Sequence, residues 1–567
     1  MKKPANLIYS VDEAPPAGVI FVSGLQHVGL ISIFLLFPLI VFREAGLPTE
    51  QLNNILSLSM LAMGVGACLS ALRVGPLGSG YLCPPVFSAF YLSPSLLALK
   101  TGGLSLLFGM TLFAGFIEAA LSRVQRHLRA YFPPELAGLL VLLIGVNVGA
   151  IGVRNVLGIS APTPFGTGEY VVAAVTLGSM ITLGVWGRGA LKMFSALLGM
   201  ILGYAAAVAA GILTTADLEK VTAAPFVSIP SLAHLGWTWD AALAIPFAIG
   251  ALAACLKNIG CVTTAQKIND ADWVRPDMRS AERGVLADAA GTFAAGLLGT
   301  VGINSSPTSI GVSNASGVTS RRVAYAIAGI FVILAFLPKV AGYLAIMPRP
   351  VIGAALLFAA CYVFINGLQI ISSRLLDARR TFVIGLSFMM GIAVDIYPAY
   401  FAQFAGSLHP MLGSSLVFGV VCATFLNLIF RLGIRRSEKL SVKAEEVDAR
   451  GIEEFMETHG AAWGARRDVI DRAAFNLTQS IESIVEGFEP QGPLEIEATF
   501  DEFNLDIRVS YMGPPLELPD KRPTNEEIME SEAGQRKLAG FMLRRYADRV
   551  AASHRNGRST LLFHFDH

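Results

Sequence analysis

Long apolar windows alternate with short polar stretches along most of this chain of 567 residues. A helix that crosses a bilayer needs about 20 mainly apolar residues, and about 14 windows reach that length. The first seven are expected near residues 18–42, 54–72, 81–98, 103–123, 135–154, 168–187 and 191–214. The second seven are expected near residues 241–262, 284–301, 304–317, 321–345, 349–371, 379–398 and 411–432. The pattern therefore predicts an all-α polytopic membrane protein.

Two of these windows, the third and the tenth, are short and interrupted by proline or glycine. Residues 81–99 read YLCPPVFSAFYLSPSLLAL, and residues 302–317 read GINSSPTSIGVSNASG. Interrupted segments in matching positions of two halves indicate the binding site of a transporter, because irregular backbone persists at membrane depth only where protein buries it or a wet cavity adjoins it. We therefore expect both segments to be broken and to form a wall of a substrate site. The alternative is a pair of kinked helices packed through small residues.

Positive charges are concentrated in alternate loops. One set of loops holds Arg73; Arg123, Arg126 and Arg129; Arg188; Lys267, Arg275, Arg279 and Arg283; Arg321 and Arg322; Arg374, Arg379 and Arg380; and Arg435, Arg436 and Lys439. The opposite set holds single charges such as Arg43, Lys100, Arg154 and Lys220. Because positive loops stay in the cytoplasm, we expect a multi-pass protein of the plasma (cytoplasmic) membrane with both termini cytoplasmic. Residues 1–17 then form a cytoplasmic segment without the apolar core of a cleavable signal peptide.

Composition agrees with a lipid-embedded chain, since 53% of residues are hydrophobic and only 15% are charged. The net charge of +1 gives no reason to expect a nucleic-acid partner. The six cysteines lie in apolar stretches without a CxxC pair, so neither a disulfide framework nor a metal site is expected. The chain also lacks a P-loop, HExxH and GxSxG, which argues against an ATP motor and against an enzyme. No cofactor is expected.

The character of the chain changes after the last apolar window. We expect a transmembrane domain over residues 18–436, a linker over 437–459 and a small cytoplasmic α/β domain over 460–567. In that tail the periodicity predicts helices over residues 469–488 and 535–553, and strands over 494–502, 503–511 and 559–567.

Four stretches of the membrane part carry a family resemblance. They read GLQHVGLISIFLLFPLIVF, YFPPELAGLLVLLIGVNV, GLLGTVGINSSPTSIGVSNASGVTSRRVAYAIAG and LGSSLVFGVVCATFLNLIF. Over roughly residues 15–435, in order and spacing, the chain resembles the nucleobase–ascorbate transporters, also called xanthine/uracil permeases. The resemblance implies 14 segments in two inverted repeats of seven, divided into a core and a gate domain, and an elevator-like motion in a homodimer. It also implies a substrate held between the third, eighth and tenth segments.

The same resemblance implies a set of substrate-binding positions. They are His27 of a Gln-His pair in the first segment; Ser88, Ala89 and Phe90 in the third; Lys257 and Asn258 in the eighth; and Thr308, Ser309 and Gly311 in the tenth. This chain departs from the family pattern at two of them. Lys257 stands where the family has a glutamate, and Thr308 stands where it has an acidic or amide residue. Both carboxylate positions are lost, and the first has reversed its charge.

The reversal at Lys257 changes the chemistry expected of the site. A carboxylate accepts the N–H edge of a base, whereas an ammonium has only donors and binds carbonyl oxygens or an anion. Two other interpretations remain open for Lys257. It forms an internal salt bridge with Asp288, Glu118 or Asp395, or it extends along a helix end to the membrane interface.

Coupling to a co-transported proton or cation needs a titratable group inside the membrane. Glu118 and Asp288 are the coupling candidates, together with His27, and each also has a plausible structural role. Uniport is the alternative.

The tail weakly resembles the ATP-binding domain of anti-sigma-factor serine kinases, a histidine-kinase-like fold. The nucleotide-binding positions of that fold correspond to Asn476, Ser480 and Tyr511, the last preceding Gly513, and none is the residue type needed. We expect a non-catalytic domain that docks a cytoplasmic regulatory protein; the alternative is an appendage for stability or trafficking.

These observations predict a secondary-active transporter, a symporter for a small planar solute such as a purine or pyrimidine base or a related organic anion. Two alternatives are kept. One is an inorganic or organic anion transporter of the same seven-plus-seven fold, and the other is a sensor that binds without transport and signals through its tail. Net flux separates a transporter from a sensor.

Overall fold

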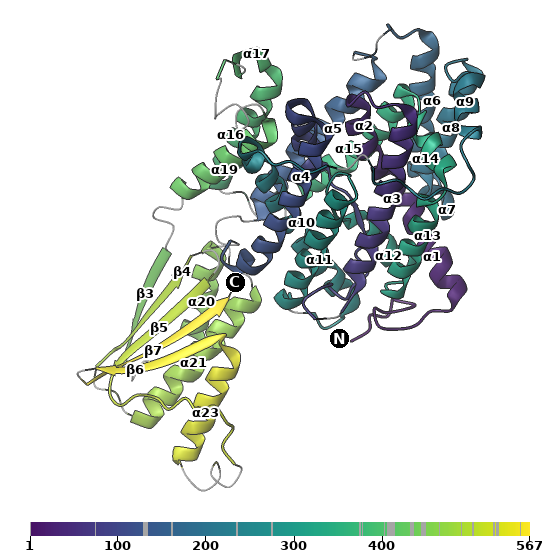
Figure 1. Ribbon diagram of the computed structural model, residues 1–567. Coiled ribbons are helices and arrows are strands. Elements are labelled where there is room, and N and C mark those ends of the chain that lie inside the picture. The colour runs from purple at the N-terminus through teal and green to yellow at the C-terminus, as the bar shows by residue number, and fades with distance from the viewer. Residues whose placement is uncertain are drawn as a thin grey trace. The chain divides into compact units, whose positions relative to one another are not determined.

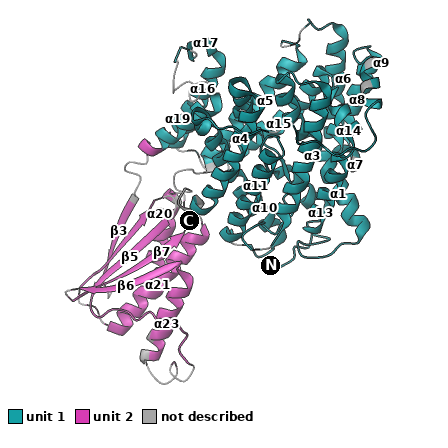
Figure 2. Ribbon diagram, in the orientation of Figure 1, with its two compact units in different colours: residues 1–427 teal, residues 428–567 magenta. Residues whose placement is uncertain are grey.

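The computed structural model describes the chain except residues 1, 74, 129–133, 160, 162, 234–235, 274–275, 373–375, 377, 402, 405–413, 431–435, 444–448, 464, 466, 489, 491, 502–503, 525–527, 529–531, 556 and 567. Some expected features fall outside the described residues, namely Arg129, Arg275, Arg374, Arg435, part of the linker and parts of the second and fourth family stretches. The described residues form two compact units, Met1–Asn427 and Leu428–His567 (Figure 2).

The first unit is built from helices that pack in two sets. The core set comprises α1 (Ala17–Ile31), η1 (Ser32–Leu35), α2 (Leu36–Glu44), α3 (Thr49–Ala71), β1 (Pro85–Phe87), η2 (Ala89–Tyr91), α4 (Leu92–Leu128), η3 (Ala241–Leu243), α10 (Ala244–Asn269), α11 (Met278–Leu297), β2 (Ile303–Ser305), α12 (Pro307–Ser316), α13 (Arg322–Ala335) and α14 (Pro338–Ala345). Within it α11 packs along α4 and α13 along α3 (Figure 1).

The gate set packs around a central helix pair, α5 and α15, with α6 and α8 beside it. It comprises α5 (Pro134–Val156), α6 (Thr167–Trp186), α7 (Ala190–Met193), α8 (Ser195–Ala209), α15 (Arg349–Ile371), α16 (Ala378–Ile396), α17 (Pro398–Phe401) and α19 (Ser415–Phe430), while α9 (Thr215–Thr222) lies between α8 and η3 in the chain. Among the described residues, seven helices are long and apolar enough to cross a membrane, or eight if the bent pair α13 and α14 counts as one span. The unit is therefore a helical polytopic membrane protein.

The third and tenth segments are each a short strand followed by a helix. Strand β1 pairs antiparallel with β2, and Val86 lies opposite Asn304. Two backbone hydrogen bonds extend the pairing, from the Ser88 N–H to the Gly302 carbonyl at 3.0 Å and from the Ser306 N–H to the Pro84 carbonyl at 3.2 Å. Each strand thus gives its membrane-depth amides a partner that lipid cannot supply.

Proline and glycine mark the ends of these breaks. Pro307 occupies the first turn of α12, where its missing N–H costs nothing. Gly317 ends α12 with a φ of 69°, a left-handed conformation that favours glycine. In α4, Gly103 has a φ of 71° and interrupts the helix where the third segment gives way to the fourth.

The N-terminal residues lie against the core set. Ile8 and Tyr9 donate backbone N–H groups to the Gly317 carbonyl at 2.8 and 3.0 Å, and the Asp12 carboxylate lies 2.9 Å from the Arg321 guanidinium. A hydrogen bond from the Lys3 ammonium lowers the pKa of the Glu13 carboxyl. Through these contacts the segment follows the loop that ends the broken tenth segment.

The second unit is an α/β domain with one antiparallel five-stranded sheet in the order β3-β4-β5-β7-β6. Its elements are β3 (Arg436–Val442), α20 (Ala449–Trp463), α21 (Arg467–Phe488), β4 (Leu494–Phe500), β5 (Asn504–Met512), α23 (Glu532–Tyr546), β6 (Arg549–Arg555) and β7 (Arg558–Asp566). Alternate residues of β4, β5 and β7 are buried and join the apolar side chains of α20 and α21 in one core.

Two expectations for the tail differ from this architecture. Residues 437–459 are not a linker, because β3 is a strand of the sheet and α20 contributes Ile452 and Met456 to the core. Residues 549–553 do not continue a helix, because the helix ends at Tyr546 and β6 follows. Both missed strands lie at the edges of the sheet, where side chains stay mostly exposed, so the alternation that indicates a strand is weak.

Candidate functional site

The paired strands bring the start of two short helices next to α10. The Nζ atom of Lys257 lies 5.6 Å from the centroid of the Phe90 ring, close enough for a cation–π interaction. Phe90 belongs to η2, directly after β1, and is buried. The break in the third segment therefore places an aromatic face beside the ammonium group.

Two glycines, one on α10 and one on α12, adjoin open space. A side-chain carbon at Gly260 of α10 or at Gly311 of α12 would meet no atom within 4 Å. Thr308 is half-buried on α12, whereas Ser309 is fully buried and its hydroxyl has no partner among the described residues. Among the predicted site residues, Gly311 thus adjoins open space, and Lys257 and Thr308 are half-buried.

Two other predicted site residues, Asn258 and Ser88, are buried next to the paired strands. The Asn258 side-chain amide donates to the Ser305 hydroxyl at 2.9 Å and is buried. The Ser88 hydroxyl accepts the Phe90 N–H at 3.3 Å, which begins the η2 turn that contains Ala89. These residues position β2 and η2 rather than face open space.

His27 is also buried. Its Nδ1 lies 2.8 Å from the Ser23 carbonyl and its Nε2 lies 3.0 Å from the Ser313 hydroxyl. The imidazole is fully buried and joins α1 to α12. His27 thus contacts the backbone of Ser309, another predicted site residue, at 3.2 Å, while its own ring is buried between α1 and α12.

The two coupling candidates occupy different surroundings within the core set. Asp288 on α11 accepts three hydrogen bonds, from Asn304 Nδ2 at 2.8 Å, from the Ser305 N–H at 2.8 Å and from the Ser305 hydroxyl at 2.9 Å. Glu118 on α4 accepts a hydrogen bond from the Tyr91 hydroxyl. Both carboxyl groups are buried.

Three carboxylates were expected as partners of Lys257, namely Asp288, Glu118 and Asp395. No described carboxylate lies within ion-pair distance of its ammonium, but the charge of Asp288 acts on it through space. Asp395 lies on α16 of the gate set and Glu118 lies beside Tyr91. Lys257 therefore keeps donors available for another group.

The membrane part of the chain is similar to known transporters. A family model described as "Permease family", Xan_ur_permease, matches residues 18–400. The chain belongs to this permease family. The family consists of membrane transporters, not enzymes.

Relatives of the permease cover most of its membrane part. Xanthine permease XanP of Escherichia coli (strain K12) is 28% identical over 442 residues, which is 75% of this chain and 95% of the relative. Uric acid permease PucJ of Bacillus subtilis (strain 168) is 27% identical over 440 residues, which is 76% of this chain and 96% of the relative.

One solved structure shares the fold of the permease. It is the murine Solute Carrier 26 family member A9 (Slc26a9) anion transporter in the inward-facing state, with a TM-score of 0.50 and 12% identity, covering 84% of this chain and 85% of that chain. At this identity the likeness shows a common transporter-like fold and nothing more.

A small cavity of the permease lies between the core and gate sets. It measures about 100 Å³ and is lined by Ser93, Pro94, Leu97, Asn147, Pro246, Asp395, Ser414 and Ser415. The core side is mainly apolar and the gate side is polar, since Asn147 donates to the Ser415 hydroxyl at 2.9 Å. Three of its lining residues, Ser93, Pro94 and Leu97, lie in the first turns of α4, directly after η2.

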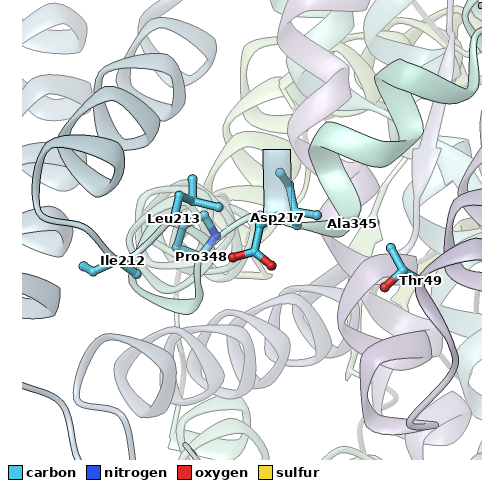
Figure 3. A pocket seen from close by; sticks show the side chains of 7 residues that line it. Thr49, Ile212, Leu213, Asp217, Ala345 and Pro348 are labelled. Atoms are coloured by element: carbon cyan, nitrogen blue, oxygen red, sulfur yellow. The ribbon is translucent and has the colours of Figure 1, made fainter. Parts of the chain in front are cut away.

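A second cavity of about 250 Å³ is away from the predicted site. Thr49, Ile212, Leu213, Asp217, Ala345, Ile346 and Pro348 line it, at helix ends and loops (Figure 3). Asp217 already serves a capping box with Thr214 at the start of α9. None of the residues expected to bind substrate contributes to this cavity.

Sequence reasoning missed the polar residues that hold β2 in place. Asn304, Ser305 and Thr292 are buried, and Thr292 donates to the Ile303 carbonyl at 2.8 Å. They have the residue types of an ordinary small-residue interface. The signal available was the polar run inside the tenth window, which predicted a break in that segment but neither the strand nor its partner Thr292 on α11.

In the tail, the three positions matched to nucleotide-binding residues are buried. Asn476 donates to the Leu543 carbonyl at 3.3 Å, and Ser480 to the Leu477 carbonyl at 2.8 Å. The Tyr511 hydroxyl donates to the Pro514 carbonyl at 2.8 Å, and burial raises the pKa of this phenol. All three side chains serve the internal packing of the second unit. Among the described residues of both units, no three His, Cys, Asp or Glu side chains are grouped so that they could hold a metal ion.

Proposed function

We propose that this permease is a secondary-active transporter of small planar solutes, namely purine or pyrimidine bases or related organic anions. The observation that carries the proposal is the Lys257 ammonium over the Phe90 ring, at the point where the two broken segments pair. An aromatic face and a cation side by side suit a flat, electron-rich ring with carbonyl oxygens on its edge.

Within that class we favour oxo-substituted or anionic rings over bases that present a donor edge. Lys257 offers only N–H donors, and no described carboxylate is close enough to neutralise them. The names of the relatives, xanthine and uric acid permeases, support solutes of this kind. An inorganic anion remains the second candidate, since the same ammonium suits it.

The transport cycle that we propose moves the core set against the gate set, in an elevator-like manner, across 14 segments arranged as two inverted repeats. The crossing of β1 with β2 lies wholly in the core set, so a bound solute would travel with it. We further propose a homodimer in the plasma membrane with both termini cytoplasmic, a co-transported proton or cation, and a regulatory partner for the tail.

The test is ligand-dependent stability followed by flux. Purified protein in detergent is heated with uracil, xanthine, urate, adenine, ascorbate, sulfate or bicarbonate, because a ligand that binds only the folded state stabilises it by mass action. Protein in liposomes is then assayed for net uptake of the ligand that stabilises it.

Our first prediction concerns Lys257→Ala. Loss of a charged hydrogen-bond donor costs about 1.5–3 kcal/mol, so the affinity for xanthine or urate should fall about tenfold to a hundredfold. Lys267→Ala is the matched control, because it removes an ammonium from the last turn of the same helix, where Lys267 lies over Trp273. Unchanged affinity in Lys257→Ala would remove the lysine from the site. Binding without flux in the wild type would favour a sensor.

A further inference from the structure

Two buried carboxyl groups of the core set have contrasting hydrogen bonds. Asp288 accepts three, all from Asn304 and Ser305 at or next to β2, and it also interacts with the Lys257 charge. These contacts stabilise its ionised form. Asp288 is therefore better supported in its ionised form than Glu118, and its hydrogen bonds hold the strand of the broken tenth segment.

Glu118 lacks such support. Its Oε1 accepts from the Tyr91 hydroxyl, and the Thr292 hydroxyl, at 3.4 Å, has a better acceptor in the Ile303 carbonyl at 2.8 Å. Its Oε2 is buried and has no hydrogen-bond partner among the described residues. A charge in that position is poorly compensated, whereas a protonated carboxyl is tolerated.

The described neighbours of Glu118 do not supply a compensating cation. The titratable groups that face it are Tyr91 from η2, Asp288 from α11 and Cys255 from α10, whose thiol lies 3.9 Å from the Glu118 carbonyl oxygen. None of these is positively charged, and Asp288 repels a second negative charge. When the surroundings of two buried acids favour different protonation states, the acid whose protonated form is favoured is the one suited to carry a proton.

We propose that Glu118 carries the co-transported proton, with Tyr91 linking it to the substrate wall. The assignment rests on the proposed transport function. Tyr91 directly follows Phe90 in the η2 turn. A solute that moves the Phe90 ring therefore also moves the Tyr91 hydroxyl, which donates a hydrogen bond to Glu118. The proton binds Glu118 on the acidic side of the membrane, travels with the loaded core set and is released on the other side.

The test uses the full chain in liposomes with an inward proton gradient and radiolabelled xanthine or urate. Wild-type protein should accumulate the solute above equilibrium, and a protonophore should abolish that accumulation. Glu118→Gln is a neutral mimic of the protonated acid, so it should lose accumulation but keep binding and one-for-one exchange of internal for external solute. Asp288→Asn, the same change at the other acid, should lose binding and exchange together because β2 loses its anchor.

Several results would overturn the assignment. Gradient-driven accumulation by Glu118→Gln would exclude the assignment. Wild-type exchange that does not respond to the proton gradient would also exclude it, although the transport function would then still stand. If no probe binds or exchanges in the wild type, the transport function itself fails and takes the assignment with it.

A second variant, Tyr91→Phe, tests the same assignment in case Glu118→Gln does not fold. Removing the hydroxyl takes away the hydrogen bond that favours the ionised carboxyl. The pH profile of uptake should then move to higher pH while exchange persists. An unchanged profile in a folded Tyr91→Phe protein would contradict the link.

Discussion

At the scale of single residues, His27 shows how a polar side chain in a membrane segment can serve packing. Its two ring nitrogens reach Ser23 within α1 and Ser313 on α12, and none of its surface is exposed. A buried polar group in this setting is stabilising only while its partners remain.

We predict that His27→Leu destabilises the first unit by about 1–3 kcal/mol, because the contacts between α1 and α12 lose their hydrogen bonds. Thermal unfolding in detergent measures the change. Gln26→Leu is the control, since Gln26 is the half-buried neighbour of His27 on the same helix. Equal unfolding temperatures combined with lost ligand binding would instead make His27 a direct contact of the solute.

The limits of sequence reasoning are clear at this scale. The sequence shows that Lys257 is unusual, because it lies in an apolar window. It does not show which side chains surround Lys257 in the folded protein. Which of three acids acts on it depends on the rotation of α10 against α11, set by packing distant in sequence. For the same reason Tyr91 escapes notice, although it directly follows Phe90.

At the scale of elements, glycines allow two helices of the gate set to approach closely. Gly138, Gly145 and Gly152 recur at seven-residue spacing along one face of α5 and lie against α15. A side-chain carbon at Gly145 would lie 2.7 Å from backbone atoms of Phe364, too close for any real contact. Small residues at such contacts replace the hydrophobic drive that lipid removes.

Gly145→Ala should therefore destabilise the gate set by about 1–3 kcal/mol through overpacking. Gly149→Ala is a matched control one turn away, because its added carbon would lie 3.6 Å from the Ala360 methyl group, an ordinary contact. It should be neutral or slightly stabilising, since alanine favours a helix. Comparable unfolding temperatures for the two variants would show that α5 and α15 separate without cost.

The elements that sequence predicts well are those with a strong period. The apolar windows predicted a helical membrane unit, of which seven or eight described helices are long and apolar enough to span, and the alternation in β4, β5 and β7 predicted three strands. Edge strands such as β6 leave most side chains exposed, and α20 buries only a narrow stripe that includes Ile452 and Met456. Their patterns are therefore too weak to distinguish from a linker.

At the scale of the whole molecule, the two units have separate stabilising interactions. The sheet of the second unit closes its own core, in which Leu477, Ile507 and Phe563 are fully buried. The first unit keeps the paired strands and the Lys257 site within Met1–Asn427. The sequence indicated the division through the loss of apolar windows, but not that β3 begins directly after the undescribed residues 431–435.

We predict that a chain ending at residue 435 retains ligand-dependent stabilisation and flux, because every residue assigned to the site lies in the first unit. Residues 436–567 expressed alone should fold, with a cooperative unfolding transition that matches the sheet and its helices. The pair of fragments also separates the functions considered for the tail. If the shortened chain binds and transports as the full chain does, the tail serves docking or trafficking. If it transports only when the tail is absent, the second unit restrains the cycle, and a partner that binds the tail would release transport.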